Sequence, residues 1–311
     1  MKMLVLKVDV DTYRGTLEGV PALLRLLDRY GLRATFLFSL GPDHTGRAIR
    51  RIFRPGFLSK VRRTSVVSHY GLLTMLYGVL LPGPHIGRRL SGVLRQVRAA
   101  GHETGIHCYD HVRWQDFVAD KGARWTAREM NRAREAFVAA VEAAPATIGA
   151  AGWQINPSVI ELEQQMGFRY ASDVRGNAPF LPVMEGVPSR CVQLPTTLPT
   201  LDELLGVDDL DLSNVADFLL RQTESRTGCQ VYTLHAELEG MKMLPVMESL
   251  LTGWLDQGFH LGTMADGYRT LDVARLPHRE IVWAQVPGRS GRLACEGRLV
   301  SSSATQEVAG I

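Results

Sequence analysis

The chain has 311 residues, which is enough for one large α/β domain or two ordinary ones. Hydrophobic residues make up 45% and charged residues 22%, as in ordinary globular proteins, and a net charge of +3 does not by itself indicate a class of partner. The four cysteines are widely spaced without a CxxC pair, which argues against a disulfide scaffold or a Cys-rich zinc site and fits a reducing compartment. The first residues contain no long apolar run with a cleavage site, so we expect no signal peptide.

Hydrophobic periodicity predicts strands and helices that alternate along most of the chain. The helix predicted at 126–144 would begin with a capping box, with Thr126 as N-cap and Glu129 three residues later. From Gly297 onward the sequence is polar, small and aperiodic, which predicts a loose tail. In chain order the predicted elements are a strand at 3–10, a helix at 18–30, a strand at 33–39, a helix at 90–100, a strand at 103–109, the helix at 126–144, a strand near 147, a helix at 157–166, strands at 168–172 and 191–195, a helix at 213–223, a strand at 230–235, a helix at 243–257 and a strand at 259–264.

Polar residues cluster where several of these strands end. Asp9 and Asp11 lie at the end of the first strand, His107 and His111 at the end of the strand predicted at 103–109, Asp173 after the strand at 168–172, and His235 ends a later one. The alternating order predicts an α/β fold with a parallel sheet, open or closed into a barrel. In βα barrels the carboxyl ends of the strands carry the chemistry, so these side chains are candidates for one site.

Two histidines and two aspartates make a candidate metal site. His107 and His111 have the spacing H-x-x-x-H, which lets both rings face one point on a helix or tight turn, although surface or packing roles are commoner at this spacing. Asp9 and Asp11 share one side of a strand end, and the plain alternative is that one of them caps the next turn. Together the four residues supply three ligands and a spare carboxylate, the minimum for metal-assisted hydrolysis.

His235 ends the strand predicted at 230–235. Taken alone, such a histidine is as often a packed residue at the barrel rim as a functional one. Beside a hydrolytic metal site it becomes the candidate general acid, because a leaving amine needs a proton and histidine titrates near neutrality.

The order of these motifs resembles the polysaccharide deacetylases, the NodB-homology group of carbohydrate esterase family 4. The matching features are the carboxylate-ended first strand, the sequence GHETGIHCYDH at 101–111, and Leu234-His235. The resemblance implies a distorted (β/α) barrel and one divalent metal ion. By resemblance the functional residues are the base Asp9, the metal ligands Asp11, His107 and His111, and the acid His235.

Six longer blocks resemble one subfamily, the 4-deoxy-4-formamido-L-arabinose-phosphoundecaprenol deformylases. Such enzymes remove formate from a lipid-linked aminosugar made for lipid A modification. The resemblance implies a polyprenyl phosphate-linked formamido sugar as substrate, a role in resistance to cationic antimicrobial peptides, and peripheral attachment to the cytoplasmic face of the bacterial inner membrane. The blocks are DVDTYRGTLEGVP at 9–21, SLGPD at 39–43, AAGWQ at 150–154, SDVRGNAPF at 172–180, LPTTLPTLDE at 194–203 and YTLHAELEG at 232–240.

The sequence departs from the family pattern at two places. Val10 separates two aspartates that are more often adjacent, which leaves open which aspartate takes which role. The family's third motif has an arginine that steadies the base, whereas residues 150–153 here contain none; Arg175 is a candidate replacement or a surface salt-bridge partner. Within the matching blocks the candidates for substrate binding or support are Arg14, Trp153 (a pocket wall or a core residue), Asp173, Arg175 and Glu237.

Residues 44–87 form an insertion that a compact βα unit does not need. Its first part is basic with interleaved apolar residues, and no Asp, Glu, Lys or Arg occurs between Arg63 and Arg88. Prolines and glycines make a spanning helix improbable, and the pattern favours a segment that docks on an anionic membrane surface. A solvated basic helix packed on the barrel is the alternative, while no recognised fold supports nucleic acid as a partner. The candidate docking residues are Arg50, Arg51, Arg62 and Arg63.

We therefore expect one catalytic barrel at 1–280, which includes the insertion at 44–87, and a partly flexible extension at 281–311. The expected reaction is hydrolysis of a linear amide, the formamide of the lipid-linked sugar. The alternatives are a polysaccharide or peptidoglycan N-deacetylase with an open groove, and an inactive barrel that binds carbohydrate or lipid. Two imidazoles and one carboxylate suit zinc, but cobalt, manganese or nickel could occupy the same site.

Overall fold

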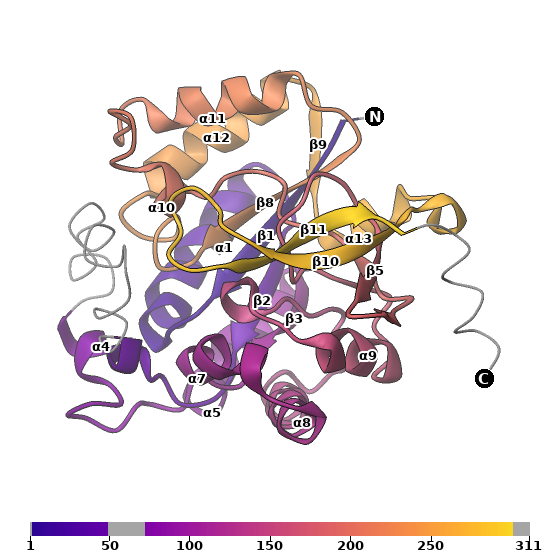
Figure 1. Ribbon diagram of the computed structural model, residues 1–311. Helices are drawn as coiled ribbons and strands as arrows, with labels where there is room; N and C mark the ends of the chain where they lie inside the picture. The colour runs from indigo at the N-terminus through magenta and orange to yellow at the C-terminus, as the bar shows by residue number, and fades with distance from the viewer. Residues whose placement is uncertain (1, 49–71, 301–311) are drawn as a thin grey trace.

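The computed structural model describes residues 2–48 and 72–300, and its centre is a parallel sheet. The strands of this sheet are β1 (Lys2–Val10), β2 (Thr35–Ser39), β3 (Glu103–Cys108), β8 (Cys229–His235) and β9 (Phe259–Gly262). Strand β1 pairs with β8 along one edge (Figure 1). Its other edge pairs with β9 in the amino-terminal half and with β2 in the carboxyl-terminal half, and β3 continues the sheet beyond β2. The central strand therefore has neighbours on both sides along its whole length.

Further backbone pairings beyond β3 extend the sheet until it closes into a distorted barrel. Ile148 bridges Ile106 of β3 and Ala171, so the strand predicted near 147 is a single bridging residue. The next two strands pair in parallel. Thr197 then bonds the backbone of Val231 in β8, which closes the ring. The two strands on this irregular side are β4 (Tyr170–Ala171) and β7 (Val192–Gln193).

Helices cover the outside of the barrel, as Figure 1 shows for α8, α9, α11 and α12. The longer ones end close to where the sequence predicts. In chain order the helical elements are η1 (Gly15–Gly19), α1 (Val20–Arg29), α4 (Leu72–Leu76), α5 (Ile86–Arg89), α6 (Ser91–Ala99), α7 (His111–Phe117), η3 (Val118–Asp120), α8 (Ala123–Val141), η4 (Ala151–Trp153), α9 (Pro157–Gln165), α10 (Leu201–Leu204), α11 (Val215–Glu224), α12 (Leu244–Asp256), α13 (Met264–Arg269) and η5 (Val273–Arg275). None of the helices in the described part of the chain is long and apolar enough to cross a membrane.

Helix α8 begins at Ala123, so the predicted capping box at Thr126 is wrong. The Thr126 hydroxyl instead donates to the Gly122 carbonyl and accepts from the Asn156 side chain. Glu129 is buried and lies beside arginine side chains. Contacts with residues from elsewhere in the fold therefore engage the Thr126 and Glu129 side chains, which the local sequence predicts to cap the helix.

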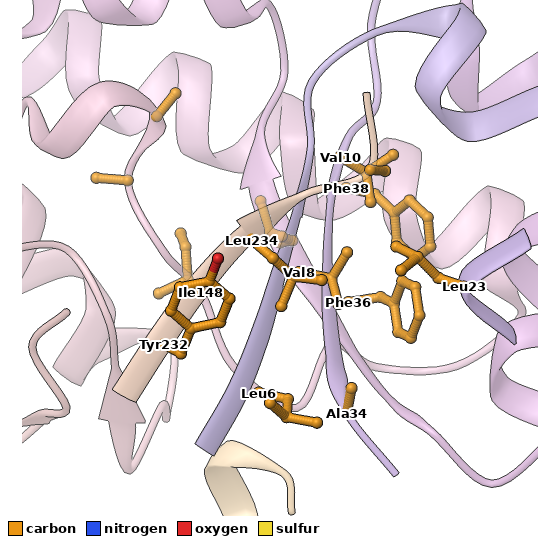
Figure 2. Close-up of a cluster of buried hydrophobic side chains, with 14 of the residues drawn as sticks. Leu6, Val8, Val10, Leu23, Ala34, Phe36, Phe38, Ile148, Tyr232 and Leu234 are labelled. Carbon is orange, nitrogen blue, oxygen red and sulfur yellow. The ribbon is translucent and has the colours of Figure 1, made fainter. Parts of the chain in front are cut away.

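The two faces of β1 pack against different surroundings. Leu6, Val8 and Val10 lie in the main core, in one cluster with residues of β2 and with Leu23 of α1 (Figure 2). Each such fully buried apolar side chain contributes about 1.5–3 kcal/mol to stability. Met3 and Val5, on the opposite face, belong to a second buried cluster with Val231 and Met264. Because side chains alternate along a strand, Lys7 and Asp9 follow Met3 and Val5 on the face that points into the barrel.

A second, four-stranded sheet lies beside the barrel, in the order β11-β10-β5-β6. Strand β11 continues to Leu299, so the loose tail predicted from Gly297 is wrong for 297–299, and 301–311 lie outside the described residues. The predicted boundary between residues 280 and 281 falls inside β10. The strands are β5 (Leu181–Met184), β6 (Val187–Pro188), β10 (His278–Ala284) and β11 (Leu293–Leu299).

The connection between β10 and β11 returns to the barrel through Arg289. Its guanidinium pairs with Asp202 at 2.8 Å and Glu203 at 2.7 Å, and also donates to the Thr200 hydroxyl at 2.9 Å. Burial raises the pKa of Glu203, but the nearby Arg289 and Arg175 more than offset this and hold it below its usual value. The C-terminal sheet thus supplies a counter-charge to carboxylates that are already almost fully buried.

Candidate metal centre and active site

Asp11, His107 and His111 meet at the carboxyl-terminal end of the barrel strands. Asp11 directly follows β1, His107 is in β3, and His111 is the first residue of α7. The Nε2 atom of His107 lies 3.2 Å from one Asp11 carboxylate oxygen, and Nε2 of His111 lies 3.4 Å from the other. One ligand atom from each residue falls within 4.8 Å of the others. Two imidazoles and one carboxylate at this separation match the donor set of a catalytic zinc-type site.

The surroundings of these residues fit a bound cation. Nδ1 of His107 donates to the Gly149 carbonyl oxygen at 2.7 Å, which turns Nε2 of the same ring toward Asp11. A Cβ at Gly149 would lie 2.5 Å from the end of the Leu37 side chain and 3.0 Å from the Ser172 carbonyl oxygen, so a larger residue would crowd this part of the backbone. Burial raises the pKa of Asp11, but His111 and His107 more than offset this and hold it well below its usual range. Asp11 therefore stays an anion, as a carboxylate ligand of a metal must be.

Glu237 holds the backbone around Asp11. Its Oε1 atom accepts from the Asp11 and Thr12 backbone N–H groups at 3.0 and 2.8 Å, and from the Thr12 hydroxyl at 2.8 Å. Burial, and then the Asp11 charge, raise the pKa of Glu237 well above its usual value. Glu237 therefore holds the backbone of the turn after β1 through its Oε1 atom.

Asp9 lies beside the candidate ligands but has a different partner. Its Oδ2 atom is 3.3 Å from Nζ of Lys7, and its Oδ1 atom is 3.9 Å from Nδ1 of His107. The Nε2 atom of His107 is the one that faces Asp11. The geometry therefore separates the two aspartates, with Asp11 between the imidazoles and Asp9 beside the ammonium group.

Lys7 is the functional candidate that sequence reasoning missed. It is fully buried, donates to the Ser172 carbonyl oxygen at 3.2 Å and lies 5.6 Å from the centre of a Trp153 ring. The pattern that places Asp9 and Asp11 on one side of β1 also places Lys7 there, two residues earlier. Arg175, the candidate replacement for the missing arginine, pairs with Glu203 at 2.5 Å. In this structure the cation next to Asp9 is Lys7.

Lys7→Met is expected to lower kcat about ten- to a hundredfold while metal content stays at wild-type level, because the partner that orients Asp9 is lost. Breaking a buried ion pair should also reduce the free energy of unfolding by about 3–5 kcal/mol. Steady-state kinetics, metal analysis and denaturant unfolding measure the three quantities. Lys2→Met is the matched control, since Lys2 lies on the same strand and bonds the Glu224 carbonyl far from the site. Unchanged kcat in the Lys7 variant would contradict this role.

His235 lies next to Asp9 on the neighbouring strand, because the two residues are paired in the parallel β1–β8 register. Its Nδ1 atom is buried and has no hydrogen-bond partner among the described residues. Its backbone N–H donates to Glu239 at 2.8 Å, and Tyr232 donates to the other oxygen of that carboxyl group at 3.0 Å. Burial raises the pKa of Glu239 to about 7. Glu239 thus holds the end of β8 through the His235 backbone, and the Nδ1 atom of the imidazole keeps its hydrogen-bonding capacity.

Of the remaining candidates, two lie near the barrel interior. Trp153 is buried and carries the guanidinium groups of Arg175 and Arg289 at 5.1 and 4.7 Å from its ring centre. Asp173 is buried, accepts from the Ala150 N–H and from Gln193, and is close enough to Lys7 for the ammonium charge to oppose the rise that burial causes in its pKa. The structure thus brings Trp153 and Asp173 to the surroundings of Lys7.

The other candidates lie away from the centre or beyond the described residues. Arg14 forms a partly exposed pair with Glu18 at 3.1 Å, and the structure gives it no contact with the candidate ligands. The four candidate docking arginines, Arg50, Arg51, Arg62 and Arg63, lie outside the described residues.

Comparison with known proteins finds one family and relatives along almost the whole chain. Residues 2–171 match the family model for polysaccharide deacetylase. The chain is 36% identical over 297 residues to a Shewanella sediminis protein named probable 4-deoxy-4-formamido-L-arabinose-phosphoundecaprenol deformylase, and the match covers 95% of both chains. A protein of the same name from Wigglesworthia glossinidia brevipalpis is 29% identical over 287 residues, covering 92% of this chain and 99% of that one.

Solved structures agree on the fold. A Mycobacterium smegmatis protein assigned as a polysaccharide deacetylase superposes with a TM-score of 0.60 at 16% identity, covering 92% of this chain and 96% of that one. A probable polysaccharide deacetylase of Pseudomonas aeruginosa gives a TM-score of 0.57 at 14% identity, covering 86% and 89%. At such identities the likeness establishes the architecture alone, and it confirms the predicted distorted barrel.

Proposed function

Because the chain belongs to the polysaccharide deacetylase family, we propose that it hydrolyses the formamide of a polyprenyl phosphate-linked 4-deoxy-4-formamido-L-arabinose. The products are formate and the 4-amino sugar, which serves the modification of lipid A. The observation that carries this proposal is the 36% identity over 95% of both chains to a protein named for that activity. The buried groups around Asp11 supply the matching chemistry for hydrolysis of an amide.

In the proposed mechanism each polar group at the barrel mouth has one task. Asp11, His107 and His111 would hold one divalent ion, which polarises the formyl carbonyl and lowers the pKa of water. Asp9, oriented by Lys7, accepts a proton from the water whose oxygen attacks the formyl carbon. His235 donates a proton to the nitrogen as the C–N bond breaks, so the amine leaves uncharged. The donor set suits zinc, with cobalt, manganese and nickel as the other candidate ions.

The proposed activity is tested by incubating the purified protein with the lipid-linked formamido sugar and following the mass of the lipid. We expect a loss that corresponds to replacement of the formyl group by hydrogen, with one formate released for each amine formed. Chelation should stop the reaction and a divalent ion should restore it. An N-acetylated oligosaccharide serves as the competing substrate. Turnover of the oligosaccharide without turnover of the formamido lipid would replace this proposal with polysaccharide N-deacetylation.

We further propose that the protein attaches peripherally to the cytoplasmic face of the membrane through the insertion. The described part of the insertion has an apolar tip between α4 and α5, where Val79 and Leu80 are 53% and 75% exposed. A cation lies directly behind this tip, because Arg47 donates to the Gly78 carbonyl oxygen at 3.0 Å. Exposed apolar side chains beside basic ones are what an interfacial segment presents to an anionic bilayer.

Leu80→Asp is expected to reduce flotation with anionic vesicles, because a carboxylate at the tip opposes both burial and the negative surface potential. Turnover of a lipid-free formamido sugar should be unchanged. The matched control is Leu212→Asp, another exposed leucine, which lies in the segment before α11 and outside the insertion. Equal flotation of the Leu80 variant and wild type would mean that this tip does not contact the bilayer.

A further inference from the structure

A basic cavity of about 510 Å³ adjoins the candidate metal centre. It lies between the start of the insertion, the connection from β3 to α7, and helix α8. None of the residues that line it is among those assigned to catalysis or to the metal. Four arginines dominate its walls, namely Arg47, Arg113, Arg128 and Arg132.

The charges around this cavity do not balance. Glu129 is 3% exposed and lies 3.4, 3.9 and 3.5 Å from Arg113, Arg128 and Arg132. The second carboxylate, Asp110, is already engaged by His44 at 2.6 Å and by the Arg113 backbone N–H at 3.0 Å. Among the described residues, the four guanidinium groups that line the cavity therefore outnumber the carboxylates of Asp110 and Glu129, so the cavity is basic.

The arginines are held in place while their ends stay accessible. The Arg113, Arg128 and Arg132 side chains are 41%, 58% and 46% exposed. Arg132 stacks over the Tyr109 ring at 4.0 Å, and Arg113 lies 5.5 Å from the centre of the Trp125 ring. Stacked guanidinium groups with free N–H donors match the planar, multidentate recognition of phosphate oxygens.

The position of the cavity relates it to the substrate. Asp110 lines the cavity and immediately precedes the metal ligand candidate His111, and Arg113 follows two residues later on the same helix. In a 4-formamido pyranose sugar, the formamide on C4 and the substituent on C1 lie at opposite ends of the ring. A ligand with its formamide at the metal centre therefore carries its C1 substituent one ring-length away.

We propose that this cavity is the subsite for the phosphodiester that joins the sugar to its lipid carrier. The arginines neutralise the phosphate and set the distance at which the formamide reaches Asp9 and Asp11. The identity of the sugar rests on the proposed function, whereas the affinity of the cavity for a phosphodiester rests on the arginines alone. The inference thus assigns the insertion and α8 a part in substrate selection.

The first test compares two substrates, the formamido sugar as a short prenyl phosphodiester and the same sugar as a methyl glycoside. The readout is the ratio of their kcat/KM values. In the double variant Arg128→Gln/Arg132→Gln this ratio is expected to fall about ten- to a hundredfold, as for the loss of charge-assisted hydrogen bonds. The control Arg134→Gln, an exposed arginine on the same helix outside the cavity, should keep the wild-type ratio. An unchanged ratio, or an equal fall on both substrates, would overturn the inference.

The second test is independent of catalysis. A sugar-free methyl prenyl phosphodiester is titrated into the metal-loaded protein by calorimetry. Wild type and Arg134→Gln should bind it equally, and the double variant about ten- to a hundredfold more weakly, with added salt weakening binding to wild type. If the formamido sugar is not hydrolysed at all, the proposed function fails while this titration still decides the phosphate subsite. Equal binding by the double variant and wild type would overturn the subsite.

Discussion

Replacing His107 with alanine is expected to remove the divalent ion and reduce turnover to background. His107 Nε2 faces Asp11, and its Nδ1 atom is held by the Gly149 carbonyl oxygen, so alanine removes both the candidate ligand atom and the hydrogen bond that orients it. Only Asp11 and His111 would remain, which is fewer than the three protein ligands of catalytic zinc-type sites. Metal content per chain, measured by mass spectrometry of the purified protein, checks this directly and without an activity assay.

His102→Ala is the control for that experiment. His102 is buried in the same motif, but its Nδ1 atom accepts from the Ala34 backbone N–H at 3.2 Å and its ring packs edge-on against Phe36. Burial, with Arg33 nearby, lowers the pKa of His102 to about 4, so the ring is neutral and structural. This variant should lose stability but keep its metal. Stoichiometric metal in the His107 variant would refute the assignment of the site.

Asp9→Asn is expected to keep the metal while kcat falls by about two to four orders of magnitude, the usual contribution of a proton-transfer group. An amide fills the same space beside Lys7 but cannot accept the proton of the attacking water. Asp11→Asn should instead lose metal, because the carboxylate that both His107 and His111 approach becomes neutral. Metal analysis and steady-state kinetics on the two variants separate these roles.

The opposite pattern, with metal lost from the Asp9 variant and kept in the Asp11 variant, would exchange the roles of the two aspartates. The double variant Lys7→Met/Asp9→Asn adds a further check. If Lys7 acts only by orienting Asp9, its loss should cost little once Asp9 can no longer accept a proton, so the two effects should not add.

The alternation of side chains along β1 explains both what the sequence predicted and what it missed. It placed Asp9 and Asp11 on one side of a strand end, and the structure brings both to His107. The same alternation places Lys7 on that side of β1. The apolar residues around Lys7 predict a buried strand, and this pattern alone does not assign a function to the lysine. A charged residue two positions before a candidate catalytic carboxylate was the available signal.

Other differences come from contacts that local sequence does not contain. The short strand β5 pairs with β10 almost a hundred residues later, and local periodicity does not reveal a pairing between segments so far apart. Thr126 and Glu129 have the spacing of a capping box, yet their side chains bind Asn156 and nearby arginines. The existence and approximate extent of the long helices were predictable because their apolar faces repeat. The exact first residue was not, as the start of α8 at Ala123 shows.

The path of the chain through Arg289 bears on how the protein is made. Glu203 follows its first partner, Arg175, by 28 residues, but it enters the nascent chain 86 residues before Arg289, the second arginine that pairs with it. Until Arg289 is translated, the Asp202 and Glu203 carboxylates lack the arginine that the C-terminal sheet supplies. Completion of the barrel mouth therefore falls after synthesis rather than during it, since a contact this far apart in sequence forms late. A premature stop codon before codon 289 would leave an intact set of metal ligands on an unfinished rim, where chaperones and proteases act on exposed charge and apolar surface.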